Sequence, residues 1–265
     1  MMEQMGGVVV AFLFGLIFGS FLNVVILRFD DLMSVVRDRS HCPKCKTTLS
    51  WLDLIPVLSF LFLRGKCRYC QKPISWQYPV VELSTAALVA AGYYLIFLVG
   101  QPSLVAGIVA YAGYILAIGT LIAIFFHDLY EMLVPESLAY VLLVSSTIFS
   151  LFYFQDWQTT LYGGLAGLIP IALLVYPSRG ILMGEGDVKI AAALGLMVGW
   201  PSAIVFMIAS FIIGGLLGAY LLLTRQVKLK TAVPFAPFLI IGGLVALYWG
   251  PFLVTWYLGV LGYAY

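Results

Sequence analysis

Two aspartates follow or precede long apolar stretches, where an ionisable side chain is costly and its presence indicates a function. The chain has 265 residues but only twelve Asp and Glu together. Asp128 follows the uncharged stretch 83–126, and Asp187 lies in Gly184-Glu-Gly-Asp-Val-Lys189. If the two carboxyls meet, one stays protonated while the other is ionised, because like charges separate their apparent pKa values. Such a pair can hydrolyse a peptide bond; the alternative is that both acids only cap helix ends.

Two glycines favour the catalytic interpretation of Asp187. Gly184 and Gly186 lack a Cβ, so the backbone beside Asp187 can adopt unusual dihedral angles and let an extended substrate lie close. A helix is expected to begin here, and its positive end should lower the pKa of Asp187. We therefore expect Asp187 to be the ionised member of the pair and Asp128 to keep the proton.

Four cysteines form a second group with recognisable chemistry. Cys42-Pro-Lys-Cys45 is followed by 21 residues and then by Cys67-Arg-Tyr-Cys70. Two such pairs are typical of a zinc ribbon, in which four thiolates surround Zn²⁺ in tetrahedral geometry. The alternative is a pair of disulfides. With four protein ligands the zinc site would be closed to water, so its role would be structural.

The composition indicates that these residues belong to a membrane protein. Hydrophobic residues make up 63% of the chain, charged residues make up 10%, and the mean hydropathy is +1.05, whereas a soluble domain carries about 25% charged residues. This balance excludes disorder, nucleic-acid binding and a secreted disulfide scaffold. A spanning helix needs about 20 apolar residues, because hydrocarbon offers the backbone no hydrogen-bond partners. The uncharged stretches are 6–27, 83–126 with a turn near 101–102, 137–155, 157–178, 190–224 with a break at 200–201, and 231–265.

We therefore predict an all-α polytopic membrane protein with about eight transmembrane helices. The expected domains are 1–27, the first helix; 28–78, a cytoplasmic zinc-binding loop domain with four cysteines; and 79–265, a domain of seven further helices that carries both aspartates. The sixth helix is unusual, because only 11 uncharged residues separate Lys189 from Pro201. It can cross the membrane only if it begins near Ile181, which would place Asp187 inside the membrane boundary.

Small residues indicate where membrane helices pack. Gly163 and Gly167 have the four-residue spacing that lets two helices approach closely, and Gly214 and Gly218 have it too. We expect both pairs to serve packing rather than chemistry.

The distribution of basic residues predicts the orientation. Nine of the fourteen Lys and Arg lie in 28–78, which makes this loop cytoplasmic and places the N-terminus outside. Alternation through the remaining helices puts the other five on the same side: Arg179, Lys189, Arg225, Lys228 and Lys230. Both aspartates then lie at the cytoplasmic face, and the reducing cytoplasm favours zinc over disulfides. The first apolar stretch is preceded by Glu3 and by no Lys or Arg, unlike a cleaved signal peptide.

The order of several sequence blocks resembles the type IV prepilin peptidases, membrane aspartyl proteases of the Gly-x-Gly-Asp kind. The blocks cover nearly the whole chain: Gly19-Ser-Phe-Leu-Asn-Val-Val25, the two cysteine pairs, Trp51, Ile55-Pro-Val-Leu-Ser59, Leu63-Arg-Gly-Lys-Cys67, Tyr78-Pro-Val-Val-Glu82, Asp128, Pro135-Glu136, Gly184-Glu-Gly-Asp-Val-Lys189 and Pro234-Phe-Ala-Pro-Phe238. Two positions depart from the family pattern. Many relatives have Asn at the position of Asp53, and Asp is common at the position of Glu136.

The resemblance implies a substrate and a first reaction. Asp128 and Asp187 would be the catalytic pair, with Gly184, Gly186 and Lys189 in support. The enzyme would cut the basic leader from prepilins or pseudopilins of type IV pili or type II secretion. Cleavage would follow a glycine, at the cytoplasmic face of the bacterial inner membrane.

The resemblance also implies a methyl transfer. The new N-terminus would be methylated with S-adenosylmethionine as the methyl donor. The sequence has no Rossmann-type glycine loop for such a donor, so this site is expected only from the resemblance. Glu82 is the candidate residue, although an interfacial anchor beside Tyr78 is the favoured explanation of this residue.

Two other classes of membrane protein would explain part of the pattern. An ion-coupled transporter also uses glycines and buried acids in broken helices, but the cysteine loop, the lack of paired repeats and the location of both acids at one face argue against it. The second alternative is a membrane adaptor whose zinc loop binds a cytosolic partner. The expected partners are the lipid bilayer and a prepilin, with no nucleic acid.

Overall fold

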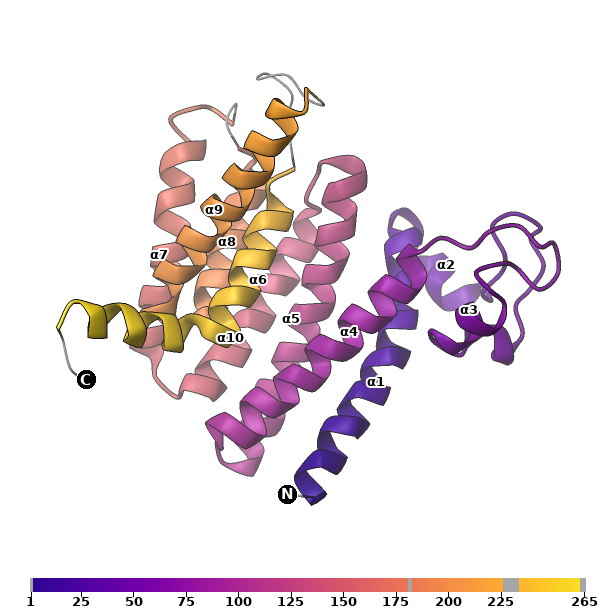
Figure 1. Cartoon of the computed structure of the whole chain (residues 1–265), viewed down its shortest axis with the longest axis horizontal. Helices are drawn as coiled ribbons and strands as arrows, with labels where there is room; N and C mark the ends of the chain where they lie inside the picture. The colour runs from indigo at the N-terminus through magenta and orange to yellow at the C-terminus, as the bar shows by residue number, and fades with distance from the viewer. Residues whose placement is uncertain (1, 181–182, 226–233, 263–265) are drawn as a thin grey trace. The chain divides into compact units, whose positions relative to one another are not determined.

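The computed structural model describes residues 2–180, 183–225 and 234–262, and within these ranges the chain is helical, as predicted (Figure 1). It divides into two compact units, Met1–Val99 and Gly100–Tyr265. Seven of the described helices are long and apolar enough to cross a membrane. The prediction of an all-α membrane protein with a cysteine-containing segment between the first two spans is therefore confirmed.

The first unit is built on two membrane helices that pack closely. Helix α1 spans Met2–Leu27, and α4, Gln77–Tyr93, continues as the π-helix η3, Tyr94–Gly100. A Cβ on Gly15 would lie 2.6 Å from Cα of Ala86, and one on Gly19 would lie 2.8 Å from Cα of Glu82. Only glycine allows this approach, so Gly15 and Gly19 form a packing motif that our sequence analysis did not single out.

The segment between α1 and α4 consists of short elements and turns. It contains the 3₁₀ turn η1, Phe29–Asp31, then α2, Leu32–Arg37, the 3₁₀ turn η2, Trp51–Leu54, and α3, Leu58–Phe62. Elements this short bury little apolar surface of their own. Their positions must be held by other interactions, such as polar contacts and the cluster of four cysteines.

The second unit is a helical bundle arranged around a short central helix. Its helices are α5, Leu104–Glu131; α6, Glu136–Phe154; α7, Trp157–Val175; α8, Glu185–Val198; α9, Ser202–Leu223; and α10, Ala236–Val260. Helix α8 packs against α6, α7 and α10 (Figure 1). Its side chains Ile190, Leu194 and Met197 are almost completely buried. The helix that carries Asp187 is therefore enclosed by its neighbours.

The predicted number of transmembrane helices needs a correction at α8. All eight predicted helices occur, but α8 has 14 residues, a length of about 21 Å that is shorter than a typical membrane span. It begins at Glu185, not near Ile181, so Asp187 lies in its first turn. Residues 181–182 lie outside the described residues, as do two of the basic residues used for the orientation, Lys228 and Lys230.

The two glycine pairs differ in how they are used. A Cβ on Gly163 would lie 2.5 Å from the carbonyl oxygen of Gly195, and one on Gly167 would overlap the carbonyl oxygen of Ala191. This pair therefore brings α7 against α8, as predicted. In the other pair, a Cβ on Gly214 would meet an aromatic ring, with Cε2 of Phe235 at 3.1 Å, whereas a Cβ on Gly218 would have no atom within 4 Å.

Candidate functional site

Asp128 lies in the last turn of α5 and is held by the way this helix ends. Met132 caps the helix in the left-handed conformation, with φ 52°, and donates its N–H to the carbonyl of Asp128 at 3.0 Å. In the following turn, Nδ1 of His127 is 2.9 Å from the carbonyl oxygen of Leu133. The Asp128 side chain is buried, and its carboxyl interacts with the backbone N–H of Ala236 at the start of α10. Its Oδ2 has no hydrogen-bond partner among the described residues, so it can bond to a second carboxyl, a water or a substrate.

Asp187 lies in the first turn of α8 and caps its own helix. Its Oδ2 accepts the backbone N–H of Gly184 at 3.2 Å. The side chain is buried, with the residue 8% exposed. The carboxyl is therefore fixed at the helix start, where the free N–H groups of the first turn point outward.

Asp128 lies on α5 and Asp187 lies on α8. Helices α6 and α10 each pack against both α5 and α8, so they hold the two helices together. Asp187, which lies outside the seven span-length helices, is close enough to Asp128 for the two charges to interact. Burial raises the pKa of Asp187 to about 7, and the charge of Asp128 acts in the same direction. The expectation that the helix start lowers this pKa is therefore wrong, because desolvation and the like charge outweigh the dipole.

The two glycines before Asp187 have different roles. A Cβ on Gly186 would lie 2.7 Å from Cβ of Val134, in the turn that follows Asp128, so this glycine lets the turn pack against the start of α8. Gly184 is exposed, and the nearest atom to its Cβ position is Oδ2 of Asp187 at 3.8 Å. Its φ of −75° is an ordinary value. Neither glycine therefore needs an unusual dihedral angle, but both leave room next to Asp187.

Lys189 holds α8 to the start of α6. Its Nζ donates to Oε1 of Glu136 at 2.6 Å and lies 5.0 Å from the ring centre of Tyr140. Glu136 is the first residue of α6, directly after the turn that follows α5. The hydrogen bond to Glu136 raises the pKa of Lys189. Lys189 therefore holds α8, which carries Asp187, against the start of α6 and keeps its charge.

The four cysteines of the first unit come together in one cluster. The sulfurs of Cys42, Cys45, Cys67 and Cys70 all lie within 4.8 Å of one another, and Sγ of Cys42 is 4.0 Å from Sγ of Cys70. A tetrahedral zinc site with Zn–S bonds of about 2.3 Å has sulfurs about 3.8 Å apart. The donors and their spacing therefore fit Zn²⁺, and a disulfide would need sulfurs about 2.05 Å apart.

The two cysteine pairs lie on turns with the same backbone geometry. Cys42 donates its N–H to Thr47 and accepts from Lys46, both at 2.9 Å, and Cys67 does the same with Lys72 and Gln71, again at 2.9 Å. The residue four positions after each first cysteine has a left-handed φ, 60° at Lys46 and 56° at Gln71. Each pair is thus placed by local turn structure.

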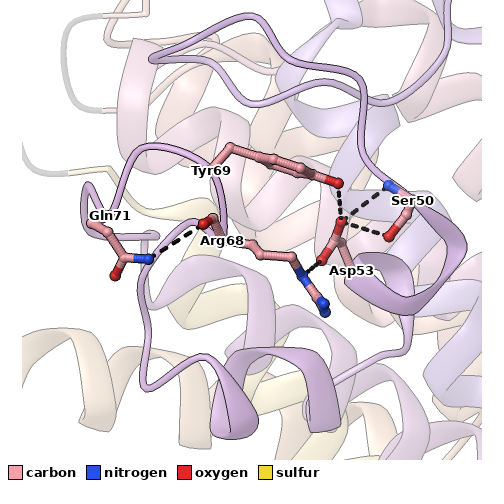
Figure 2. A network of polar contacts seen from close by, with 5 residues as sticks. All are labelled: Ser50, Asp53, Arg68, Tyr69 and Gln71. Atoms are coloured by element: carbon pink, nitrogen blue, oxygen red, sulfur yellow. Dashed lines mark hydrogen bonds and ion pairs between the residues drawn. The ribbon is translucent and has the colours of Figure 1, made fainter.

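Asp53 connects the segment between the cysteine pairs to the second pair (Figure 2). Its carboxylate accepts the backbone N–H of Ser50 at 3.0 Å, Nε of Arg68 at 2.7 Å and the hydroxyl of Tyr69 at 3.1 Å. Burial opposes ionisation, but these hydrogen bonds outweigh it and lower the pKa of Asp53. Sequence analysis noted Asp53 only as a departure from the family pattern and missed this network.

Glu82, the candidate for methyl transfer, lies in the first unit at the beginning of α4. It is 6% exposed, and its Oε2 accepts the backbone N–H of Val57 at 2.7 Å. Glu82 therefore contacts the loop as well as its own helix, which agrees with an anchoring role.

Comparison with known proteins places the chain in a family. Residues 13–96 match the bacterial peptidase A24 N-terminal domain, and residues 114–219, which include both aspartates, match the type IV leader peptidase family. The prepilin leader peptidase/N-methyltransferase of Aeromonas hydrophila is 34% identical over 93% of this chain and 92% of its own length. The protein of the same description from Bacillus subtilis (strain 168) is 33% identical over 94% and 97%. No solved structure matches significantly.

The chain therefore belongs to the type IV leader peptidase family, a bacterial family of multi-pass membrane enzymes. The resemblance read from the sequence blocks is confirmed. These relatives carry names for two activities, a leader peptidase and an N-methyltransferase.

Proposed function

We propose that this protein cleaves the leader peptide of type IV prepilins or pseudopilins and that Asp128 and Asp187 are its catalytic pair. The observation that carries the proposal is the interaction of two buried carboxyls within the region that matches the leader peptidase family. Two buried carboxyls whose charges interact favour a state with one proton between them.

The chemistry follows from that shared proton. The protonated carboxyl donates to the oxygen of the scissile carbonyl, while the ionised carboxylate takes a proton from the attacking water. The unpartnered Oδ2 of Asp128 is available for either task, whereas Oδ2 of Asp187 is tied to the N–H of Gly184. Gly184, exposed and without a side chain, leaves space for an extended leader beside Asp187. Gly186 and Lys189 support the pair by fixing α8 against the turn after α5 and against α6.

The membrane location supports the same substrate. Nine of the fourteen basic residues lie between the first two spans, which favours a cytoplasmic loop and an N-terminus outside the bacterial inner membrane. Under this orientation the aspartates face the cytoplasm, where the basic leader of a membrane-inserted prepilin lies. The lipid bilayer and the prepilin are therefore the proposed partners.

Zinc is proposed as a structural cofactor of the loop. Cys42, Cys45, Cys67 and Cys70 would hold the ion as thiolates and leave no position for water. Bound zinc would link the two turns and stabilise a segment with little apolar core.

The second proposed activity is methylation of the N-terminus that cleavage exposes, with S-adenosylmethionine as methyl donor. The names of the relatives support this activity. The donor supplies an activated methyl group. Glu82 is the proposed residue of this chain for the second reaction.

The direct test is incubation of the purified protein in detergent with a prepilin, with and without S-adenosylmethionine, followed by mass spectrometry. Loss of the leader supports the peptidase, and a further gain of one CH₂ unit supports the methyl transfer. An ion-coupled transporter or a zinc-containing adaptor would leave the prepilin intact, and that result would contradict the proposal.

A further inference from the structure

A buried amide oxygen without a partner lies in the first unit. Asn23, on α1, is 1% exposed, and its Nδ2 donates to the carbonyl oxygens of Gly19 at 3.4 Å and Tyr78 at 3.1 Å. Its Oδ1 is buried and has no hydrogen-bond partner among the described residues. An unsatisfied buried acceptor costs about 1–3 kcal/mol, so this oxygen calls for a donor.

A buried carboxylate with no ion-pair partner among the described residues lies on α4, the helix that packs against α1. Glu82 receives the N–H of Val57 and a side-chain hydrogen bond from Ser20, which are both neutral donors. The ion pairs found in the described part of the chain involve other residues, Arg68 with Asp53 and Lys189 with Glu136. A buried carboxylate is costly unless it is paired with a positive charge or takes up a proton.

The two acceptors belong to one site between α1 and α4. Asn23 follows Gly19 by one helical turn, and a Cβ on Gly19 would lie 2.8 Å from Cα of Glu82. Tyr78, whose carbonyl receives Nδ2 of Asn23, precedes Glu82 by one turn. Asn23 and Glu82 therefore lie on facing positions of α1 and α4 that are about one helical turn apart along the helices.

The loop closes over this site with a strained turn. Val57 has φ 60° and ψ −47°, and the N–H of Leu58 bonds to the carbonyl of Pro56 at 2.6 Å. This is a γ-turn with positive φ, which is rare and strained, above all for a β-branched residue. The N–H of Val57 points at Oε2 of Glu82, so the carboxylate holds the strained turn in place.

Among the residues that the structure describes, the unsatisfied amide oxygen of Asn23 and the unpaired carboxylate of Glu82 indicate which ligand fits the site. Two oxygen acceptors and one uncompensated negative charge match a primary ammonium, which carries three N–H donors and a positive charge. A divalent cation such as Ca²⁺ or Mg²⁺ needs about six oxygen ligands, more than Asn23 and Glu82 provide. Relying on the proposed function, we propose that Asn23 and Glu82 bind the N-terminal ammonium that leader cleavage exposes on the pilin. The same chemistry would also accept a lysine side chain of the leader.

The first test uses the unmodified full-length protein. A peptide with the N-terminal sequence of the mature pilin is titrated with its amine free and with its amine acetylated, and binding is measured by calorimetry in detergent. The leader peptide, rich in lysine but acetylated at its N-terminus, is the third ligand. The free amine should bind about tenfold more tightly than the acetylated one. Equal affinities would overturn the proposal, and tighter binding of the leader peptide would assign the site to lysine instead.

The second test uses variants that separate the charge from the fold. Glu82→Gln keeps an oxygen for the N–H of Val57 but loses the charge, and Asn23→Leu removes the amide oxygen. Both should abolish the tenfold preference for the free amine. Ser84→Ala, on the same helix with its hydroxyl bonded only locally to Val81, should keep it. If Glu82→Gln retains the preference, the proposal is wrong. Should that variant fail to fold, the comparison of free and acetylated peptides on the unmodified protein still decides.

These results can be told apart from a failure of the proposed function. Leader cleavage of an intact prepilin is measured on the same unmodified preparation. No cleavage would contradict the peptidase assignment, whereas cleavage without any preference for the free amine contradicts only the ammonium site.

Discussion

The four cysteines and the two aspartates are positioned in opposite ways. Each cysteine pair lies on a turn that is closed by hydrogen bonds between residues at most five positions apart. The aspartates are 59 positions apart, and their positions depend on the packing of long helices. Helices α6 and α10 pack against both α5 and α8, and the glycines of α7 let α8 pack closely within the bundle. The first site is assembled by local backbone geometry and the second by helix packing.

Because of this difference, substitutions at the cysteines should affect folding, whereas substitutions at the aspartates should affect catalysis. Removing a cysteine takes away an interaction that holds together short elements with little core. Removing an aspartate leaves the packing of the bundle in place, because the helices are fixed by apolar side chains and glycines. Substitutions in the two regions should therefore fail in different assays.

The largest effect is expected for Asp187→Asn. The amide keeps an oxygen for the N–H of Gly184 but cannot take part in proton transfer, so prepilin cleavage should fall about a thousandfold or more. Cleavage is followed by mass spectrometry and folding by thermal unfolding. Asp156→Asn is the matched control, since Asp156 only caps α7 and Asn is an equally good cap. Activity of Asp187→Asn within a few fold of the unmodified protein would remove the aspartate pair from the mechanism.

Substitution of a cysteine in the proposed zinc site is expected to impair folding of the loop rather than peptide cleavage. In Cys67→Ser, one thiolate of four is lost, and bound zinc should drop about tenfold or more. Residues 28–76 should then be cut rapidly by added protease, while the helices of the second unit stay resistant. Metal content is measured by mass spectrometry and proteolysis by gel. Lys44→Ser, an exposed position between two of the cysteines, should keep both zinc and resistance. Full zinc in Cys67→Ser would contradict the four-thiolate site.

The pH dependence of cleavage tests the shared proton. Because burial and Asp128 raise the pKa of Asp187 to about 7, the singly protonated pair is lost as the pH rises above this value. The cleavage rate should therefore fall about tenfold per pH unit on the alkaline side. Initial rates between pH 5 and 9 on a prepilin without titratable groups near its cleavage site provide the measurement. A rate that stays constant up to pH 9 would show that the pair needs no proton.

Sequence reasoning succeeded where chemistry and spacing are local. The cysteine pairs are recognisable because ligand spacing within a turn is fixed by the backbone, and the apolar stretches are recognisable because a bilayer sets their length. The family resemblance followed from blocks such as the one around Asp187. The prediction that Gly163 and Gly167 serve helix packing is confirmed. It could be made from local spacing, because two glycines four residues apart give a helix a flat face.

The features it missed depend on contacts between distant segments. The short length of α8 follows from its start at Glu185, and the raised pKa of Asp187 follows from burial beside a residue 59 positions earlier. The isolated oxygen of Asn23 exists only because α1 packs against α4. The available signal was Asn23 itself, a polar residue near the end of an apolar helix. Its hydrogen-bond partner on another helix cannot be identified from the sequence alone.

A smaller effect separates the two glycines of the aspartate site. In Gly186→Ala the new Cβ would lie 2.7 Å from Cβ of Val134, so the turn must move and stability should fall by about 1–3 kcal/mol. Gly184→Ala meets no atom closer than 3.8 Å and should leave the unfolding temperature almost unchanged. Thermal unfolding of both variants gives the comparison. Val134→Gly in the Gly186→Ala background should restore much of the loss, and failure to do so would mean that the overlap is not the cause.

The smallest effect concerns the charge of Asp53. Because its pKa is lowered in the folded protein, ionised Asp53 stabilises the loop above the unfolded pKa of about 3.9, and this stability is lost as the pH falls through the lower folded value. Arg68 is 47% exposed, so Asp53→Asn should cost only about 1 kcal/mol at pH 7. The difference from the unmodified protein should be constant between pH 5 and 8 and shrink as the pH falls below the unfolded pKa of about 3.9.

The fluorescence of Trp51, which is exposed in η2 next to this network, can follow unfolding of the loop. Asp38→Asn changes the same charge at an exposed position of the same loop and is the matched control for the loss of one carboxylate. If Asp53 acts through Arg68, then Arg68→Gln combined with Asp53→Asn should cost less than the sum of the two single changes. Strict additivity would show that Asp53 stabilises the loop through Ser50 and Tyr69 alone, and that the ion pair is incidental to the cysteine module.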